Sequence, residues 1–200
     1  MPEVGLPINP LVILFAAIFT NNILLSNYLG MCSFLSVSSQ VKASWGLGAA
    51  VIFVMAVTSG INWLVYYYLL MPLNLHHFWY IIFIIVIAAF VQLVEIIIEK
   101  TSPVLHINLG IFLPLITVNC AILGASLFVI IRNYDFLQAL AFGFGGGVGW
   151  AMALVAMAGI RQKIARANIP PALEGAGIAL IIAGLMSFAV LGFSGMVQVQ

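Results

Sequence analysis

The sequence predicts an all-α integral membrane protein with six transmembrane helices, arranged as two inverted repeats of three helices each. Three observations support this prediction. Apolar residues make up 64% of the 200 residues and charged residues only 6%, whereas soluble domains carry about 25% charged residues. Six segments are long and apolar enough to cross a bilayer. A sequence motif from the first half of the chain also recurs in the second half.

The six apolar segments are residues 11–37, 46–70, 79–98, 109–131, 137–160 and 175–196. A transmembrane helix needs roughly 20 mostly apolar residues, so the first segment is too long for one regular helix. Polar residues, glycine and proline interrupt the first and fourth segments, and we therefore expect transmembrane helices 1 and 4 to be discontinuous. The interrupting residues are Thr20, Asn21, Asn22, Ser26, Asn27 and Gly30 in the first segment, and Pro114, Thr117, Asn119 and Gly124 in the fourth.

The basic residues predict how the segments are oriented in the membrane. Five of them follow the first, third or fifth segment, and one follows the fourth. Because basic loops favour the cytoplasm, both termini are expected on the periplasmic face of a bacterial inner membrane. The five are Lys42, Lys100, Arg161, Lys163 and Arg166, and the one on the opposite side is Arg132.

The connections between the segments are too short to fold as a soluble domain. Residues 1–200 are therefore expected to form one membrane domain, with repeats at about 10–100 and 105–197. Any NADH or flavin chemistry would belong to partner subunits, because a dinucleotide-binding fold needs a large α/β sheet. The scarcity of basic residues also excludes a nucleic-acid-binding face.

An internal repeat relates the two halves of the chain. Residues 45–56 and 142–153 both read aromatic-Gly-x-Gly-x-x-Val-x-x-x-Met-Ala, and in the preceding segments Cys32 aligns with Cys120 and Ser38 with Ser126. With three spans per half, the second copy must enter the membrane upside down, and such repeats place the working site near the bilayer midplane. The glycines favour close helix packing rather than a phosphate-binding loop, since no strand precedes them.

The two cysteines, Cys32 and Cys120, are the only ones in the chain, and each lies in an interrupted apolar segment. One interpretation is that they are small buried hydrophobic residues. The other is that they are metal ligands, because irregular backbone at lipid depth must line a cavity or be buried in protein. Two thiolates are half of what an iron–sulfur cluster usually takes. Their matched positions in the repeat favour the metal-ligand hypothesis.

Other polar residues within the apolar segments have two interpretations each. The asparagines near the interruptions, Asn119 among them, either satisfy backbone groups freed where the helices break or donate hydrogen bonds to cluster sulfurs; the first is favoured. Free backbone groups beside each cysteine, at Gly30 and Met31, would also point toward the sulfurs. Glu95, with Gln92 one turn away, either handles a cation or extends to the membrane interface.

Several motifs resemble those of one family of membrane proteins. They are NYLGMC at residues 27–32, LGIFLPLITVNCAI at 109–122, GFGGGVGW at 143–150, GLM at 184–186 and GFSG at 192–195. Together they resemble the membrane subunits of the sodium-pumping NADH:quinone oxidoreductase (Nqr) and of the related Rnf complex, and the resemblance runs over essentially the whole chain. AGIRQK at 158–163 is most similar to E-type subunits of Nqr. MPLNL at 71–75, KTSPVL at 100–105 and TNN at 20–22 are similar to A-type subunits of Rnf.

The resemblance implies a function that composition does not reveal. Homologous D-type and E-type subunits pair with opposite topology, and a [2Fe–2S] cluster or other iron centre lies between them, with Cys32 and Cys120 as the ligands from this chain. Electrons pass from NADH through flavins on partner subunits and iron centres to ubiquinone, while sodium is driven outward. Glu95 matches an acidic position associated with sodium uptake. The chain would be one part of a redox-driven translocase, with no catalytic site of its own.

Three alternatives remain open at the level of sequence. The chain is the A-type subunit of an Rnf ferredoxin:NAD oxidoreductase, a metal-free secondary transporter that binds solute at its broken helices, or a scaffold that only holds partner subunits.

Overall fold

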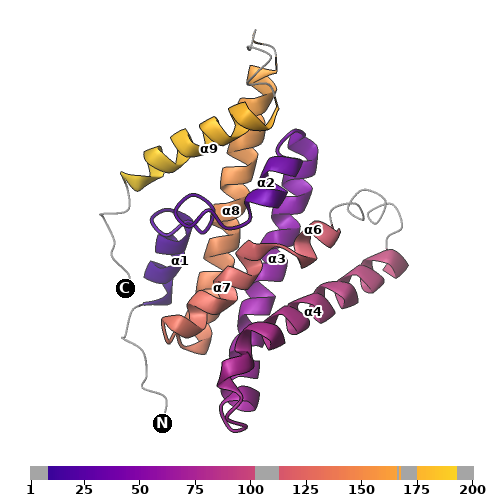
Figure 1. Ribbon diagram of the computed structural model, residues 1–200, viewed down its shortest axis with the longest axis vertical. Helices are drawn as coiled ribbons and strands as arrows, with labels where there is room; N and C mark the ends of the chain where they lie inside the picture. Colours follow the sequence, from indigo (N-terminus) through magenta and orange to yellow (C-terminus); the bar gives the residue numbers. More distant parts are fainter. Residues whose placement is uncertain (1–8, 102–112, 166, 168–174, 193–200) are drawn as a thin grey trace.

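The computed structural model describes residues 9–101, 113–165, 167 and 175–192. Every regular element within these ranges is a helix, in agreement with the predicted fold class. Figure 1 shows the two longest helices side by side at the centre of the molecule. The elements in chain order are α1 (Pro10–Ile18), α2 (Met31–Val37), α3 (Val41–Val65) continued by a π-helical turn (Tyr66–Leu70), a 3-10 turn (His76–Phe78), α4 (Trp79–Thr101), α6 (Leu113–Thr117), α7 (Cys120–Ile131), α8 (Phe136–Ile164) and α9 (Ala176–Leu191).

Four helices of the described chain are long and apolar enough to cross a bilayer, namely Val41–Leu70, Trp79–Ile97, Pro114–Ile131 and Phe136–Ile164. They correspond to the second to fifth predicted segments. The sixth predicted segment forms α9, an apolar helix of 16 residues. The first is divided into α1 and α2, of 9 and 7 residues. Six full-length spans are therefore not found within these ranges, whereas the predicted breaks in the first and fourth segments are present.

Helices α3 and α8 pack antiparallel and in close contact because α8 carries glycine where the helices meet. A Cβ atom added to Gly147 would lie 2.8 Å from Ile52 Cα, and one added to Gly143 would lie 2.6 Å from Ser59 Oγ. Small residues let helix backbones approach closely in lipid, where the hydrophobic effect does not drive helices together. The glycine-rich motif is thus a helix-packing motif, as the sequence predicts.

A second row of glycines on α8 receives α1. A Cβ atom on Gly145 would lie 2.7 Å from the Leu14 carbonyl oxygen, and one on Gly149 would lie 2.9 Å from the Ile18 carbonyl oxygen. Helix α8 therefore contacts two helices on different faces through two glycine rows, each with the i, i+4 spacing that puts residues on one face.

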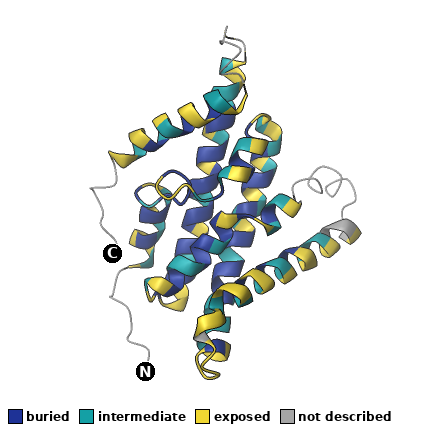
Figure 2. Cartoon of the chain, viewed as in Figure 1, coloured by how far each residue is buried: buried dark blue, intermediate teal, exposed yellow. Residues whose placement is uncertain are grey.

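Burial is concentrated in the centre of the molecule. Figure 2 shows mostly buried residues along α3, α7 and α8 and mostly exposed or half-buried residues along α4 and α9. In the apolar stretch of α8, 61% of residues are buried inside the protein, against 17% in α4. Helix α4 therefore lies at the edge, with most of its surface open to lipid or to another protein chain.

The break between α1 and α2 is held by Asn22, which is 1% exposed. Its Nδ2 donates hydrogen bonds to the carbonyl oxygens of Ile18 (3.2 Å) and of Gly149 in α8 (2.9 Å). Its Oδ1 accepts from the backbone N–H groups of Leu24 (3.0 Å) and Leu25 (3.3 Å). One side chain thus satisfies backbone groups on both sides of the break, the role that the sequence favours for the asparagines.

Two further hydrogen-bonding contacts join each discontinuous segment to the long helix of the other half of the chain. Asn62 Nδ2 in α3 donates to Ser126 Oγ in α7 at 2.9 Å. Arg161 Nη1 in α8 donates to Ser38 Oγ at 2.8 Å and to the Leu35 carbonyl oxygen at 2.9 Å, at the carboxyl end of α2. Ser38 and Ser126 are the residues that the repeat alignment pairs.

Replacing Asn22 with leucine is expected to destabilise the protein by about 2–4 kcal/mol, because the backbone groups at the break lose their partners in a buried site. Thermal unfolding of the purified protein in detergent measures the change. The matched control is Asn27→Leu, at an exposed position of the same connection, where an effect within about 0.5 kcal/mol is expected. Equal unfolding temperatures for the two variants would contradict this role of Asn22.

Candidate functional site

Both cysteines lie at the start of a helix that follows a break. Cys32 is the second residue of α2, and Cys120 is the first residue of α7. Both are exposed on the surface of the chain. The first residues of a helix have backbone N–H groups without partners inside the helix, so each cysteine is placed beside free backbone donors.

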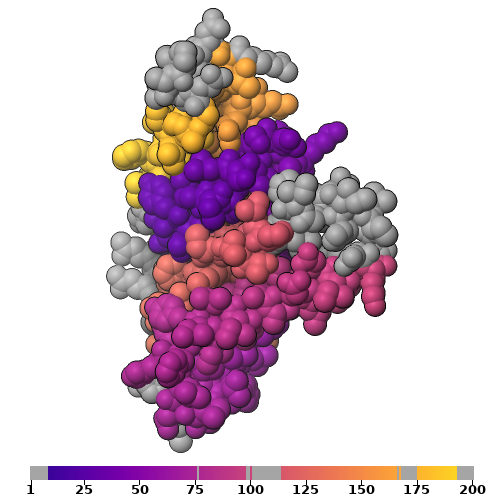
Figure 3. All heavy atoms as spheres, turned by 45° about the vertical axis from the view of Figure 1, so that its right-hand side comes forward, coloured from indigo at the N-terminus to yellow at the C-terminus, as the bar shows by residue number. Residues whose placement is uncertain are grey.

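The two breaks contact each other through Gly30, the residue that precedes α2. Gly30 has a φ of +83°, a left-handed conformation that favours glycine, and its backbone N–H donates to Cys120 Sγ at 2.9 Å. The sulfur of one cysteine therefore lies at the beginning of the short helix that carries the other. Figure 3 shows the segments that contain them, in purple and salmon, as adjoining surfaces on one face of the molecule.

Asn119 begins α7 and leaves one polar group unused. Its Oδ1 accepts from the Ala121 N–H at 3.0 Å, as in an N-cap, and the side chain is 3% exposed. Its Nδ2 is buried and has no hydrogen-bond partner. A buried donor without an acceptor costs about 1–3 kcal/mol, so this amide is suited to an acceptor that binds beside Cys120.

Trp150 packs behind the same glycine, a contact that the sequence does not predict. A Cβ atom on Gly30 would lie 2.6 Å from Trp150 Nε1 and 2.9 Å from Asn119 Oδ1. The indole is fully buried and its Nε1 has no hydrogen-bond partner. The motif GFGGGVGW contains this residue, but periodicity alone indicates only that Trp150 is a core residue of α8.

The described residues supply two ligands for a metal centre and no more. No group of three or more histidine, cysteine or acidic residues is found close together within the described ranges. An iron–sulfur cluster usually takes four cysteines, so this chain supplies half of such a set. The exposed sulfurs, the N–H donated to Cys120 and the unused Asn119 amide fit a sulfur-ligated centre whose other ligands come from outside the chain.

The remaining candidate residues have simpler surroundings. Met31 is the first residue of α2 and is half-buried, beside the exposed Cys32. Glu95 is half-buried and Gln92 exposed, one turn apart on α4. In the described part of the chain, Glu95 belongs to no group of three histidine, cysteine or acidic residues. The structure does not bring these two residues to the cysteines.

Ser187 is a functional candidate that the sequence analysis misses. Its hydroxyl donates to the Leu25 carbonyl oxygen at 2.6 Å and accepts from the Tyr28 hydroxyl at 3.0 Å. These bonds tie α9 to the connection that leads to Gly30. A lone serine in an apolar segment gives no signal of such a partner, because Ser187 and Leu25 are 162 positions apart.

Comparison with known proteins identifies relatives over almost the whole chain. Residues 11–197 match a family model described as "Rnf-Nqr subunit, membrane protein". The A-type subunit of an ion-translocating oxidoreductase complex from Syntrophotalea carbinolica is 49% identical over 189 residues, which cover 94% of this chain and 98% of that protein.

Relatives with two kinds of name are about equally similar. The A-type subunit of the Na(+)-translocating ferredoxin:NAD(+) oxidoreductase complex from Acetobacterium woodii is 51% identical, covering 92% of this chain and 96% of that protein. The E-type subunit of the Na(+)-translocating NADH-quinone reductase from Maridesulfovibrio salexigens is 50% identical, covering 90% and 94%. Overall identity therefore does not separate these two types.

Replacing Gly30 with alanine is expected to lower stability by about 2–4 kcal/mol. The left-handed backbone is unfavourable for alanine by about 1–2 kcal/mol, and the added methyl group would overlap Trp150 Nε1, a further cost of about 1–3 kcal/mol. Thermal unfolding in detergent measures the loss.

The control is Gly159→Ala, where nothing lies within 4 Å of the added Cβ atom. That change is expected to be neutral or slightly stabilising, because alanine favours a helix interior over glycine. If Gly30→Ala unfolded at the temperature of the unmodified protein, the close contact with Trp150 would be disproved.

Proposed function

Because this chain belongs to the Rnf-Nqr family of membrane proteins, we propose that it carries electrons within an ion-translocating oxidoreductase complex. In this proposal Cys32 and Cys120 supply two of the ligands of an intramembrane iron–sulfur centre, a [2Fe–2S] cluster shared with the homologous D-type subunit. Bound there, the cluster would accept and release one electron at a time. NADH and flavins would be bound by partner subunits only.

The observation that carries this proposal is the hydrogen bond from the Gly30 N–H to Cys120 Sγ. It links the two helix breaks at the place where the cysteines lie, and hydrogen bonds to sulfur are one way in which a protein sets a cluster's potential. Both cysteines are open at the surface, as ligands shared with a second protein chain must be. Small hydrophobic residues would instead be expected to be buried.

The packing supports the inverted repeat that the proposal includes. Helix α1 of the first half packs on α8, and α7 of the second half packs on α3. The paired serines, Ser38 and Ser126, each bond to the long helix of the opposite half. Repeats of this kind place their working site near the bilayer midplane, and we infer such a position for the cysteines, with both termini on the periplasmic face.

Glu95 and Gln92 are proposed to take part in sodium movement. An ionisable residue within a membrane helix is costly unless it has a function, and Glu95 is half-buried on the helix that is most open to other protein chains. Carboxylate and amide oxygens are suitable ligands for a hard cation. Electron flow toward ubiquinone would then be coupled to the outward movement of sodium.

We place the chain with the E-type subunits of Nqr on the sequence of residues 158–163. The second candidate is the A-type subunit of an Rnf complex, favoured by the TNN sequence at 20–22 and by the equal identity of relatives with that name. Purified complex that reduces ubiquinone with NADH would support the first assignment. Reduction of NAD(+) by ferredoxin would support the second.

The cysteine assignment is tested by replacing Cys32 or Cys120 with alanine. Each change is expected to remove the iron signal in electron paramagnetic resonance and to lower electron transfer to the final acceptor at least 100-fold, while the flavin subunits still oxidise NADH. The control is Ser36→Ala, an exposed position on the same short helix as Cys32. Normal iron content in either cysteine variant would refute the assignment, and a double variant with normal electron transfer would indicate a scaffold or a metal-free transporter.

The proposed role of Glu95 is tested by Glu95→Gln in membrane vesicles that contain the complex. We expect sodium uptake to fall about tenfold or more while the iron signal is unchanged, because the neutral amide attracts a cation less strongly. Glu95→Asp, which keeps the charge, should retain more of the uptake than the glutamine variant. Unchanged sodium uptake by the glutamine variant would exclude Glu95 from the ion route.

A further inference from the structure

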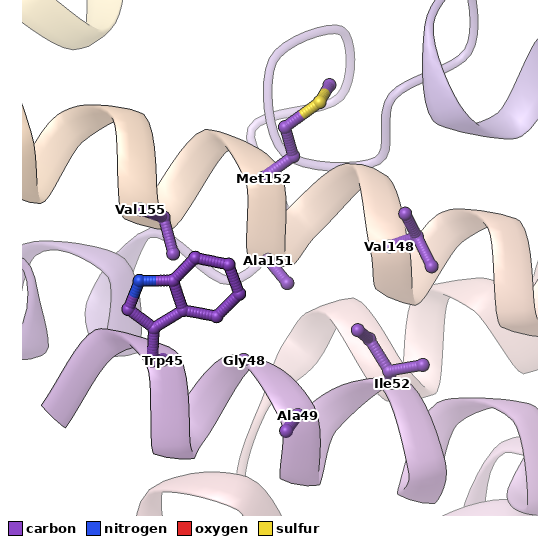
Figure 4. Close-up of a pocket in the computed structure, with 8 residues that line it drawn as sticks. All are labelled: Trp45, Gly48, Ala49, Ile52, Val148, Ala151, Met152 and Val155. Atoms are coloured by element: carbon purple, nitrogen blue, oxygen red, sulfur yellow. The ribbon is translucent and has the colours of Figure 1, made fainter. Parts of the chain in front are cut away.

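An apolar groove runs between α3 and α8 on the outer surface of the helix pair. It has a volume of about 310 Å³, within the usual range for a small-molecule site. Gly48 and Ala151 form its floor, since both are buried and a Cβ atom on Gly48 would lie 3.0 Å from Ala151 Cβ. Trp45, Ala49 and Met152 are exposed and form its rims, as Figure 4 shows. The floor is low because the residues there are small.

Two lysines lie beyond one end of the groove, where α3 begins and α8 ends. Lys42 precedes Trp45 by three residues, so both lie on one face of α3. Lys163 follows Val155, another lining residue, by two helical turns. Both lysines are exposed, and neither α3 nor α8 contains an acidic residue. This end of the groove is therefore positively charged without compensation from its own helices.

The surface between the groove and Lys163 is open. Gly159 lies one turn beyond Val155 on α8, and nothing is found within 4 Å of a Cβ atom added there. A bound molecule can therefore extend from the apolar floor to the lysines along the helix. Trp45 stands at the transition, the position that tryptophan favours at a membrane interface.

We propose that this groove binds an anionic phospholipid, with one acyl chain on the Gly48–Ala151 floor and the phosphate between Lys42 and Lys163. Basic pockets between membrane helices are suited to anionic headgroups, and each lysine near such a surface contributes about 1 kcal/mol. A transmembrane helix, about 10 Å across with its side chains, is too wide for a groove of this volume. The proposal depends on the membrane location of the chain and not on its role in electron transfer.

The groove also lacks the polar groups that a quinone head would need. Of the residues that line it, only Trp45 has a polar side-chain atom, the indole N–H. An acyl chain needs no hydrogen-bond partner, so it is the better match to a wholly apolar lining.

The test is native mass spectrometry of the purified complex incubated with mixed micelles of phosphatidylglycerol and phosphatidylcholine at equal concentration. The unmodified complex should retain phosphatidylglycerol in preference. The double variant Lys42→Gln/Lys163→Gln should lower that preference by about tenfold, as two contacts of about 1 kcal/mol each predict. The control is Lys100→Gln, an exposed lysine at the end of α4, which should have no effect.

A second variant tests the apolar part of the site. Ala49→Phe fills the groove from its rim and should lower retention of both lipids at this site, whereas Leu180→Phe, on the exposed face of α9, should not. Equal retention of the two lipids by the unmodified complex, or an unchanged preference in the double lysine variant, would overturn the proposal. Dissociation of a partner protein caused by Ala49→Phe, with lipid retention unchanged, would show that the groove is a protein interface instead.

Discussion

The satisfaction of backbone polar groups at the two helix breaks is the constraint on which the rest of this structure depends. A continuous helix satisfies its own N–H and C=O groups, but a break in an apolar environment leaves several of them without partners. Asn22 supplies four hydrogen bonds at the first break, and Asn119 caps the helix that follows the second. The breaks can then persist, and they place a cysteine at the start of each following helix.

The glycines of α8 make this arrangement possible. Asn22 reaches the Gly149 carbonyl oxygen only because α1 lies directly against the glycine row of α8. The other row brings α3 close, and α3 in turn holds α7 through Asn62 and Ser126. A packing feature of one helix therefore determines where both broken segments lie. The resulting site opens at the protein surface, as a centre shared with another protein chain requires.

The same close packing has a second consequence on the outside of the helix pair. Where α3 and α8 meet through Gly48 and Ala151, the small side chains leave a groove toward the surroundings. In water such a groove would be a cost, but in a bilayer lipid chains can occupy it. The helix pair thus holds the candidate redox site on one side and presents a surface to the membrane on another.

The sequence by itself determined the fold class and the positions of the breaks. Apolar segments long enough for a bilayer allow few structures other than helices, and Thr20, Asn22 and Asn119 mark where those helices stop. It also singled out Cys32 and Cys120, because their matched places in the repeat are visible without coordinates. Boundaries were less well determined: α3 begins at Val41, five residues before the predicted start.

Only the tertiary structure decided which residues meet. The bond from Gly30 to Cys120 joins residues 90 positions apart, and Ser187 reaches the first break across 162 positions. Trp150 against Gly30 and Asn62 against Ser126 are contacts of the same kind. Periodicity reports the face on which a residue lies, since that depends on local helix geometry. The partner on that face is set by how helices pack, and this depends on side chains throughout the chain.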